Sequence, residues 1–231
     1  SASDDRTVRL WVAQTGKAIT VLRGHEKPVR AVAFSPDVST LLASGGQDHT
    51  IKIWDLTERR SIRTLIGHQH QVNALAFSPD GLNLASSSAD KTIKLWDFAT
   101  GEVITTLMGH ALAVNAVTFS PLHPVLVSVS ADSTVKVWDL NTYEPIGTLM
   151  QHTAAVSAIA FSPDGKILAT GGEDRTIHLW DALSWQLIRT LSGHPWPVSA
   201  LSFSPDGIVR FSGSWDKTVK GWHVDTGKEC A

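Results

Sequence analysis

The chain alternates short apolar runs with turn signals along its whole length. Residues 72–110 (VNALAFSPDGLNLASSSADKTIKLWDFATGEVITTLMGH) show the pattern, since runs rich in Val, Ile, Leu and Phe are separated by Ser-Pro-Asp-Gly, Ala-Asp-Lys and Thr-Gly. Pro presets the φ angle that a turn needs, and Gly tolerates positive φ. Runs separated by such turns at intervals of roughly 8–12 residues form antiparallel strands rather than helices. The stretch therefore predicts four short strands.

Residues 92–96 indicate that such a sheet is packed on both faces. Ile93 and Leu95 point to one face of this strand, and Thr92, Lys94 and Trp96 point to the other. A large aromatic ring opposite an aliphatic face is typical of a sheet stacked between two neighbouring sheets. The unit is therefore expected to pack against others of its kind.

The same pattern recurs along the chain. Trp-Asp pairs return every 42 residues, and a histidine, usually preceded by glycine, keeps step with them. The tryptophans of the series are Trp11, Trp54, Trp96, Trp138, Trp180 and Trp222, with 43 residues between the first two. Self-similarity at this period indicates a repeat architecture.

These units resemble the blades of WD-repeat β-propellers, which have four strands in 40–45 residues with Gly-His and Trp-Asp marks. The resemblance covers essentially the whole chain. It implies an all-β propeller fold of five complete or near-complete four-stranded antiparallel blades and a partial N-terminal half-blade. We expect a single domain, 1–231, with repeat units of approximately 1–25, 26–68, 69–110, 111–152, 153–194 and 195–231.

The two ends of the chain do not carry complete units. The first unit supplies only its last two strands, about 7–11 and 18–22, and the outer strand of the last unit barely begins at 228–231. Since most WD propellers have seven blades and the chain starts at Ser1 rather than Met, we expect a fragment of a larger ring. The alternative is a five-bladed ring in which 18–22 completes the last unit and 7–11 is surplus. An open ring would expose apolar faces and favour self-association.

Each unit also contains a Ser or Thr, a His and an Asp, which together could be mistaken for a catalytic triad. Five equivalent copies do not match a single active site with its oxyanion hole and pocket. The resemblance instead implies a buried structural network of hydrogen bonds from Trp through Ser and His to Asp. Its members are His25, Ser44, Asp48, Trp54, His68, Ser86, Asp90, Trp96, His110, Ser128, Asp132, Trp138, His152, Thr170, Asp174, Trp180, His194, Ser212, Asp216 and Trp222. We therefore predict no catalytic residue.

The resemblance also implies partner contacts at three loop positions in each unit, namely one and three residues after the histidine and just before the Asp. The last unit stands out there, because Trp196 and Trp215 are aromatics outside the repeat. Trp is enriched at binding hot spots, although both rings could equally plug the channel mouth. The candidate partner-binding residues are Glu26, Pro28, Gln47, Gln69, Gln71, Thr153, Glu173, Pro195, Trp196, Pro197 and Trp215.

The composition argues against nucleic acid and membranes as partners. The net charge is −2 and the isoelectric point is near 6.5, so no overall basic field attracts nucleic acid or an anionic membrane. No apolar run approaches the roughly 20 residues that cross a bilayer. With one cysteine, Cys230, no intrachain disulfide forms, which fits a reducing compartment and a cytoplasmic location.

No cofactor is expected, because the sequence has no Gly-rich phosphate loop of the Walker or dinucleotide type. Five histidines lie outside the network without metal-ligand spacing, so we predict no metal site. They are His49, His70, His123, His178 and His223.

The function expected is a non-enzymatic scaffold or docking module that binds other proteins or peptides on its loop face, in signalling for example. The alternative is a sensor or regulatory propeller attached to a kinase or NTPase domain outside this chain. A propeller enzyme would need an acidic or metal-binding cluster near the channel, which the sequence does not show. A nucleic-acid reader is disfavoured by the charge.

Overall fold

The computed structural model describes residues 1–37, 40–224 and 226–230. All regular structure in this part of the chain is β-strand, and no helix in it is long and apolar enough to cross a membrane. The contacts group the chain into two compact units, Ser1–Gly109 and His110–Ala231, which are described separately. The expectation of a single domain remains a prediction.

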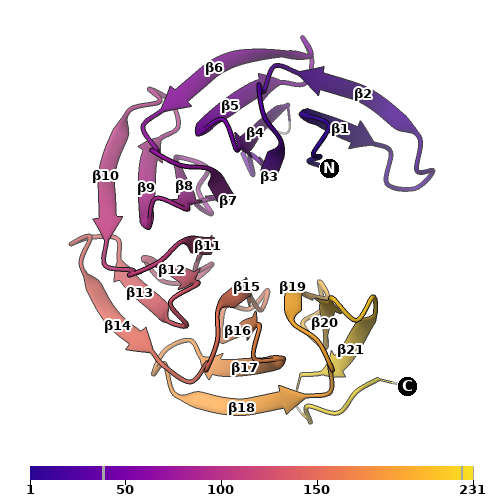
Figure 1. The fold of residues 1–231 in the computed structure, drawn as a ribbon, viewed down its shortest axis with the longest axis vertical. Helices are drawn as coiled ribbons and strands as arrows, with labels where there is room; N and C mark the ends of the chain where they lie inside the picture. The colour runs from indigo at the N-terminus through magenta and orange to yellow at the C-terminus, as the bar shows by residue number, and fades with distance from the viewer. Residues whose placement is uncertain (38–39, 225, 231) are drawn as a thin grey trace. The chain divides into compact units, whose positions relative to one another are not determined.

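The first compact unit holds three sheets of consecutive antiparallel strands (Figure 1). β1 pairs with β2, and the other two sheets have the orders β3-β4-β5-β6 and β7-β8-β9-β10. The strands are β1 (Thr7–Trp11), β2 (Ala18–Arg23), β3 (Val29–Phe34), β4 (Leu41–Gly46), β5 (Thr50–Asp55), β6 (Arg60–Ile66), β7 (Val72–Phe77), β8 (Asn83–Ser88), β9 (Thr92–Asp97) and β10 (Val103–Met108).

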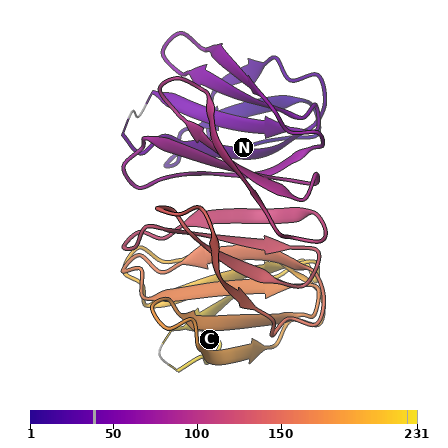
Figure 2. The ribbon, with the colours of Figure 1, turned by 90° about the vertical axis from the view of Figure 1, so that its left-hand side faces the viewer.

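The second compact unit repeats the plan with two four-stranded sheets, β11-β12-β13-β14 and β15-β16-β17-β18, and a three-stranded sheet, β19-β20-β21. In both units the strands run across the view of Figure 2 and the loops gather at their ends. The strands are β11 (Val114–Phe119), β12 (Val125–Ser130), β13 (Val135–Asp139), β14 (Pro145–Leu149), β15 (Val156–Phe161), β16 (Ile167–Gly172), β17 (Thr176–Asp181), β18 (Leu187–Ser192), β19 (Val198–Phe203), β20 (Val209–Ser214) and β21 (Val219–His223).

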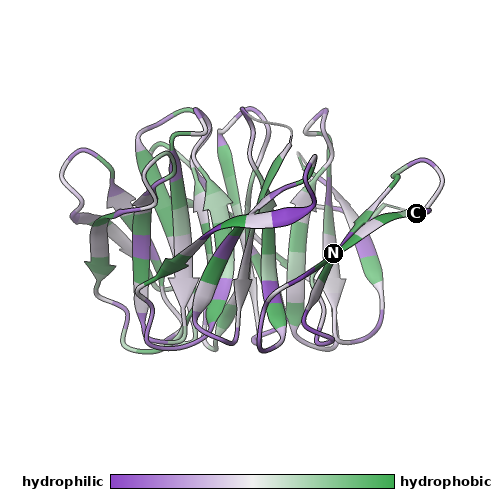
Figure 3. Cartoon of the chain, turned by 90° about the horizontal axis from the view of Figure 1, so that it is seen from above, coloured by the Kyte–Doolittle hydropathy of each residue, from purple (hydrophilic) through white to green (hydrophobic). Residues whose placement is uncertain are grey.

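The core lies between successive sheets, as the alternation of side chains along the strands predicts. In the first compact unit, Ile51 and Ile53 of β5 pack with Val72 and Leu84 of the next sheet. Trp54 of the same strand lies in a different cluster, against the sheet before it. Figure 3 shows the hydrophobic residues concentrated in the strands and the hydrophilic ones at the loops. Both faces of β5 are thus packed, because successive side chains of a strand point to opposite sides.

The first sheet contains more than the two strands expected. Ala2 forms a bridge with Val8, and the backbone N–H of Arg9 donates to the Ser1 carbonyl at 2.9 Å. The first residues therefore pair with β1, in the place that β8 holds beside β9.

The last sheet has only a trace of its outer strand. Trp222 forms an isolated bridge with Glu229, and Cys230 N–H donates to the Gly221 carbonyl at 2.8 Å. Ala231, the last residue of the expected strand at 228–231, lies outside the described residues. The all-β fold of four-stranded antiparallel units, with incomplete units at both ends, is confirmed.

A repeated hydrogen-bond network and the loop edge it supports

One hydrogen-bond network recurs in five repeats, which begin at β3, β7, β11, β15 and β19 and are called full repeats because each carries all four network residues. In the repeat of β7–β10, the Trp96 indole N–H donates to Ser86 Oγ at 2.8 Å, and His68 Nε2 lies 2.7 Å from the same oxygen. His68 Nδ1 lies 2.7 Å from Asp90 Oδ2. Because indole only donates and a carboxylate only accepts, the donors run from Trp through Ser and His to Asp, with the His68 proton on Nδ1.

The register of the strands brings these residues together. Ser86 pairs with Lys94, two positions from Trp96 on the same face, and the histidine reaches them from the loop that precedes β7. The Ser–His distance is 2.7–2.9 Å and the His–Asp distance 2.7–3.0 Å in every repeat. The structure thus places all twenty residues of the expected network in contact, repeat by repeat.

The network lies in a setting that suits bracing and not nucleophilic attack. Ser44, Ser86, Ser128, Thr170 and Ser212 are fully buried, so no substrate carbonyl can approach their hydroxyls. Each hydroxyl also accepts the indole N–H, which leaves fewer lone pairs for a nucleophile. A buried network whose members are all satisfied stiffens the elements that it joins.

In the repeat of β11–β14, electrostatics keep His110 neutral and Asp132 charged. Burial lowers the pKa of His110 below its ordinary value, and the neighbouring Asp132 only partly opposes this. Burial raises the pKa of Asp132, but hydrogen bonds from the Thr134 hydroxyl and the Ala111 N–H outweigh it and lower that pKa to about 2. At neutral pH the pair is therefore imidazole and carboxylate.

A fifth residue type completes the network, and the sequence analysis missed it. The threonine two positions after each Asp donates its hydroxyl and its backbone N–H to Oδ1 of that carboxylate, at 2.6 and 3.0 Å in the case of Thr92 and Asp90. The periodic Asp-x-Thr spacing is the signal that would have found them. They are Thr50, Thr92, Thr134, Thr176 and Thr218.

The partial first repeat carries members of the same network. Trp11 Nε1 donates to Ser1 Oγ at 3.0 Å, and Thr7 donates to Asp5, as in the full repeats. Asp5 Oδ2, which would face a histidine in a full repeat, accepts instead from Arg9 at 2.5 Å. The equivalence of Ser1 with Ser86 was not recognised from the sequence.

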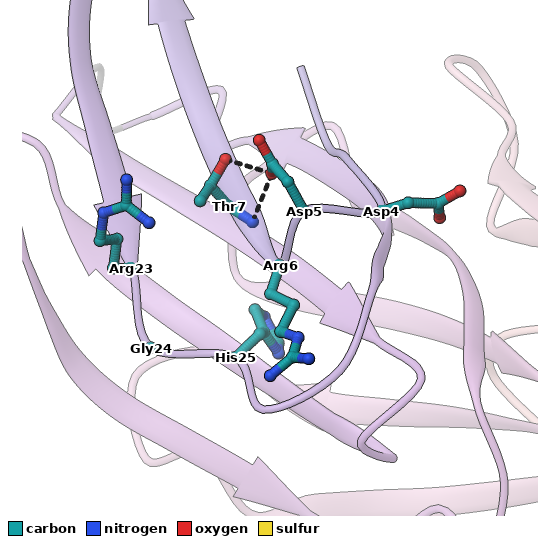
Figure 4. Close-up of a pocket in the computed structure, with 7 residues that line it drawn as sticks. All are labelled: Asp4, Asp5, Arg6, Thr7, Arg23, Gly24 and His25. Carbon is teal, nitrogen blue, oxygen red and sulfur yellow. Dashed lines mark hydrogen bonds between the residues drawn. The ribbon is translucent and has the colours of Figure 1, made fainter.

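A polar pocket of about 520 Å³ opens beside the turn that precedes β1 (Figure 4). Asp4, Asp5, Arg6 and Arg23 line it together with Thr7 and His25. Because two carboxylates balance two guanidinium groups, the lining has no net charge that would select an anion or a cation.

The three candidate partner positions of each repeat lie together at one loop edge. The N–H of the residue after the histidine donates to the network Asp, as Gln69 does to Asp90 at 3.0 Å. The N–H of the third position donates to the carbonyl of the second, as in Ala89 to Gln71 at 3.0 Å. The equivalent pairs are Gln47 with Pro28, Ala131 with Ala113, Glu173 with Ala155 and Trp215 with Pro197.

The exposure of the candidate partner residues differs. Glu26, Gln69, Thr153, Glu173, Pro195, Trp196 and Trp215 are exposed, and Pro28, Gln47, Gln71 and Pro197 are half-buried. Gln71 is occupied locally, because its amide donates to Asn73 at 3.0 Å. The loop edge of the last repeat therefore presents the largest exposed apolar side chains among the candidates.

The last repeat also differs in its backbone. Pro195 follows His194, so the donor that Glu26, Gln69, Ala111 and Thr153 supply to their aspartates is missing there. As in other repeats, Trp215 N–H donates to the carbonyl of the third residue after the histidine, Pro197, at 3.0 Å, and Ser214 Oγ donates to the Trp196 carbonyl at 3.1 Å. These bonds hold the two loops that carry the tryptophans side by side.

Repeated four-stranded sheets, braced by a Trp–Ser–His–Asp network, define the blades of a β-propeller protein. The family described as "WD domain, G-beta repeat" matches residues 16–55, 59–97, 101–139, 143–181 and 185–223. The chain therefore belongs to the WD40 repeat family, whose repeats generally mediate protein–protein interaction and are typically not enzymatic.

Curated proteins match over about one repeat each. The chain is 57% identical over 37 residues to F-box-like/WD repeat-containing protein TBL1X of Mus musculus, covering 16% of this chain and 7% of that protein. It is 51% identical over 37 residues to WD40 repeat-containing protein HOS15 of Arabidopsis thaliana, covering 16% and 6%. It is 48% identical over 46 residues to WD repeat and SOCS box-containing protein 1 of Danio rerio, covering 20% and 11%. The matches span only a small part of these relatives.

Proposed function

We propose that this chain is a non-enzymatic docking module that binds a protein or peptide at the loop edge of its last repeat. The observation that carries the proposal is the exposure of two tryptophans on neighbouring loops, 58% for Trp196 and 65% for Trp215. Large aromatic side chains supply much of the binding energy of protein interfaces, because they bury a large area and still offer an N–H.

Three features support contact rather than a plugging role. Both rings are more than half exposed among the described residues. Their loops are tied to each other through backbone atoms of Pro197 and Trp196, so the rings are presented on a fixed base. Pro195 and Pro197 restrict φ on either side of Trp196, which lowers the entropy lost when a partner orders the loop.

A selection from a random peptide display library, carried out on the chain of residues 1–231, tests the proposal. Peptides that bind the wild-type chain are measured against Trp196→Ala, Trp215→Ala and Leu183→Ala by calorimetry. Leu183 is 77% exposed but lies in the turn after the Trp180-Asp181 pair, so it controls for nonspecific apolar contact.

We expect Trp215→Ala to weaken binding by about 2 kcal/mol or more, which is roughly thirty-fold in the dissociation constant. Leu183→Ala leaves it unchanged. Equal affinities for the wild type and both tryptophan variants, with unchanged thermal unfolding, would place the docking surface elsewhere.

A further inference from the structure

The repeat of β15–β18 departs from the others around one imidazole. Where β5, β9, β13 and β21 carry a lysine, at Lys52, Lys94, Lys136 and Lys220, β17 carries His178. In the same repeat Gln151 replaces the glycine before the network histidine, and Thr170 replaces the network serine. These three changes gather around His152.

His178 partly takes over the contact of the lysine that it replaces. Lys94 Nζ donates to Thr106 on the outer strand at 2.8 Å, and Nδ1 of His178 lies 2.9 Å from the equivalent Thr190. The shorter imidazole also turns toward the network, because its ring centroid lies 4.3 Å from that of His152. Its Nε2 is 3.3 Å from Thr176 Oγ1, which in turn donates to Asp174.

The register of the sheet thus brings two imidazoles and one carboxylate to a single point. One ligand atom from each of His152, Asp174 and His178 lies within 4.8 Å of the others, and the shortest pair, His152 Nδ1 and Asp174 Oδ2, is 2.7 Å apart. Ligand atoms that surround Zn²⁺ tetrahedrally at about 2.0–2.2 Å are about 3.3 Å from one another. The shortest separation is below this value and the others are at most 4.8 Å, so side-chain rotations bring the three atoms to the spacing of zinc ligands.

We propose that His152, Asp174 and His178 form a site for a divalent transition metal, with Zn²⁺ as the best match. Two imidazole nitrogens and one carboxylate oxygen are ligands that zinc accepts, and three protein ligands leave a fourth position open. The proposal goes against the expectation of no metal from sequence spacing, since His152 and His178 are 26 residues apart in the chain.

Among the equivalent strands β5, β9, β13, β17 and β21, β17 alone carries an imidazole at this position. In the other repeats a lysine ammonium stands in the same place and would repel a cation.

Metal binding also reverses one hydrogen bond of the network. Without metal, His152 carries its proton on Nδ1, toward Asp174, and its Nε2 accepts from Thr170. When Nδ1 binds the metal, the proton moves to Nε2, which then donates to Thr170 Oγ1. The ring stays neutral, and the change of tautomer is a signature that stray surface binding does not produce.

Three chains test the proposal by calorimetry with ZnCl₂ and by absorption of bound Co²⁺. They are a parent chain with no further change, His178→Lys, which restores the residue of the other repeats, and Lys94→His, which copies the cluster beside His68 and Asp90. All three carry His70→Ala, because the rings of His49 and His70 lie 5.9 Å apart and offer a competing pair. Unfolding curves establish that each chain is folded.

We expect one Zn²⁺ to bind the first chain, affinity at least ten-fold weaker for His178→Lys, and a second equivalent for Lys94→His. Nitrogen NMR of the wild type shows the His152 tautomer change on addition of Zn²⁺. Equal zinc uptake by the first chain and folded His178→Lys, or no uptake by either, would overturn the proposal.

Discussion

Nδ1 of His68 lies 2.7 Å from Oδ2 of Asp90, and this contact ties the loop before β7 to the turn between β8 and β9. Both groups are almost fully buried, with exposed side-chain fractions of 1% and 8%. The same link holds the loop edge in every full repeat. A surface that binds partners needs such a fixed base, because a mobile loop loses entropy when it is ordered.

Replacing His68 with alanine is expected to destabilise the chain by about 1–3 kcal/mol, because Ser86 and Asp90 lose a buried partner. His70→Ala, two residues away and exposed, is the matched control and is expected to leave stability unchanged. Urea unfolding followed by circular dichroism measures both. Equal midpoints for the two variants would show that the network contributes little to stability.

Adjacent serines in β8 separate the hydrogen-bonding role of the hydroxyl from its burial. Ser86 and Ser87 are both fully buried, but Ser86 Oγ contacts Trp96 and His68, whereas Ser87 Oγ has no hydrogen-bond partner among the described residues. Ser86→Ala is expected to cost about 1–3 kcal/mol, because it leaves two buried nitrogens without their shared oxygen.

Ser87→Ala is expected to leave the melting temperature unchanged or raise it, since the hydroxyl is desolvated without compensation. Scanning calorimetry of both variants gives the comparison. A loss of stability for Ser87→Ala as large as that for Ser86→Ala would contradict this prediction.

Gly171 of β16 tests how closely successive sheets approach, and the equivalent Gly213 of β20 is its control. A Cβ on Gly171 of β16 would lie 2.7 Å from Cγ1 of Val198 in the next sheet, whereas a Cβ on Gly213 of β20 would meet Ala200 at 3.5 Å. Gly171→Ala is therefore expected to cost about 1–3 kcal/mol through overpacking.

Gly213→Ala is expected to be neutral or to stabilise by about 0.4–1 kcal/mol, because alanine restricts the unfolded chain. Thermal unfolding at one protein concentration measures both variants. If the two melt together above the wild type, the sheets have more room than the structure gives them.

His178 makes stability depend on pH. Its pKa is lowered from its ordinary 6.5 to about 4, first by burial and then by His152. Between these values the unfolded chain binds a proton that the folded chain does not, so stability falls as the pH drops from about 6.5 to about 4. The loss attributable to His178 is at most about 3 kcal/mol.

Urea unfolding at several pH values in EDTA, which removes competing metal, measures this dependence. His178→Gln is expected to weaken the dependence of the unfolding free energy on pH over that range, because up to one proton fewer is taken up on unfolding. Parallel curves for the wild type and His178→Gln would mean that another group is responsible.

The chemistry and period of the residues let the sequence alone specify the strands, and the resemblance to WD-repeat blades indicated the members of the network. The 42-residue return of Trp96 and its equivalents, with turn residues between apolar runs, predicts β1–β21 closely, because strand periodicity and turn chemistry are local properties. That resemblance assigned the His, the Ser or Thr, the Asp and the Trp of each repeat to the network before its geometry was known.

Only the tertiary structure decided which side chains meet outside the shared pattern. The cross-strand register places His178 beside His152, although sequence spacing gives no sign of it, because strand pairing joins residues that are far apart in the chain. The tertiary structure also places Trp215 next to Pro197. It shows that Ser1 holds, in the first, partial repeat, the position that Ser86 holds in the repeat of β7–β10. Local residue chemistry thus determined the repeated pattern, and the packing of residues distant in the sequence determined where single repeats depart from it.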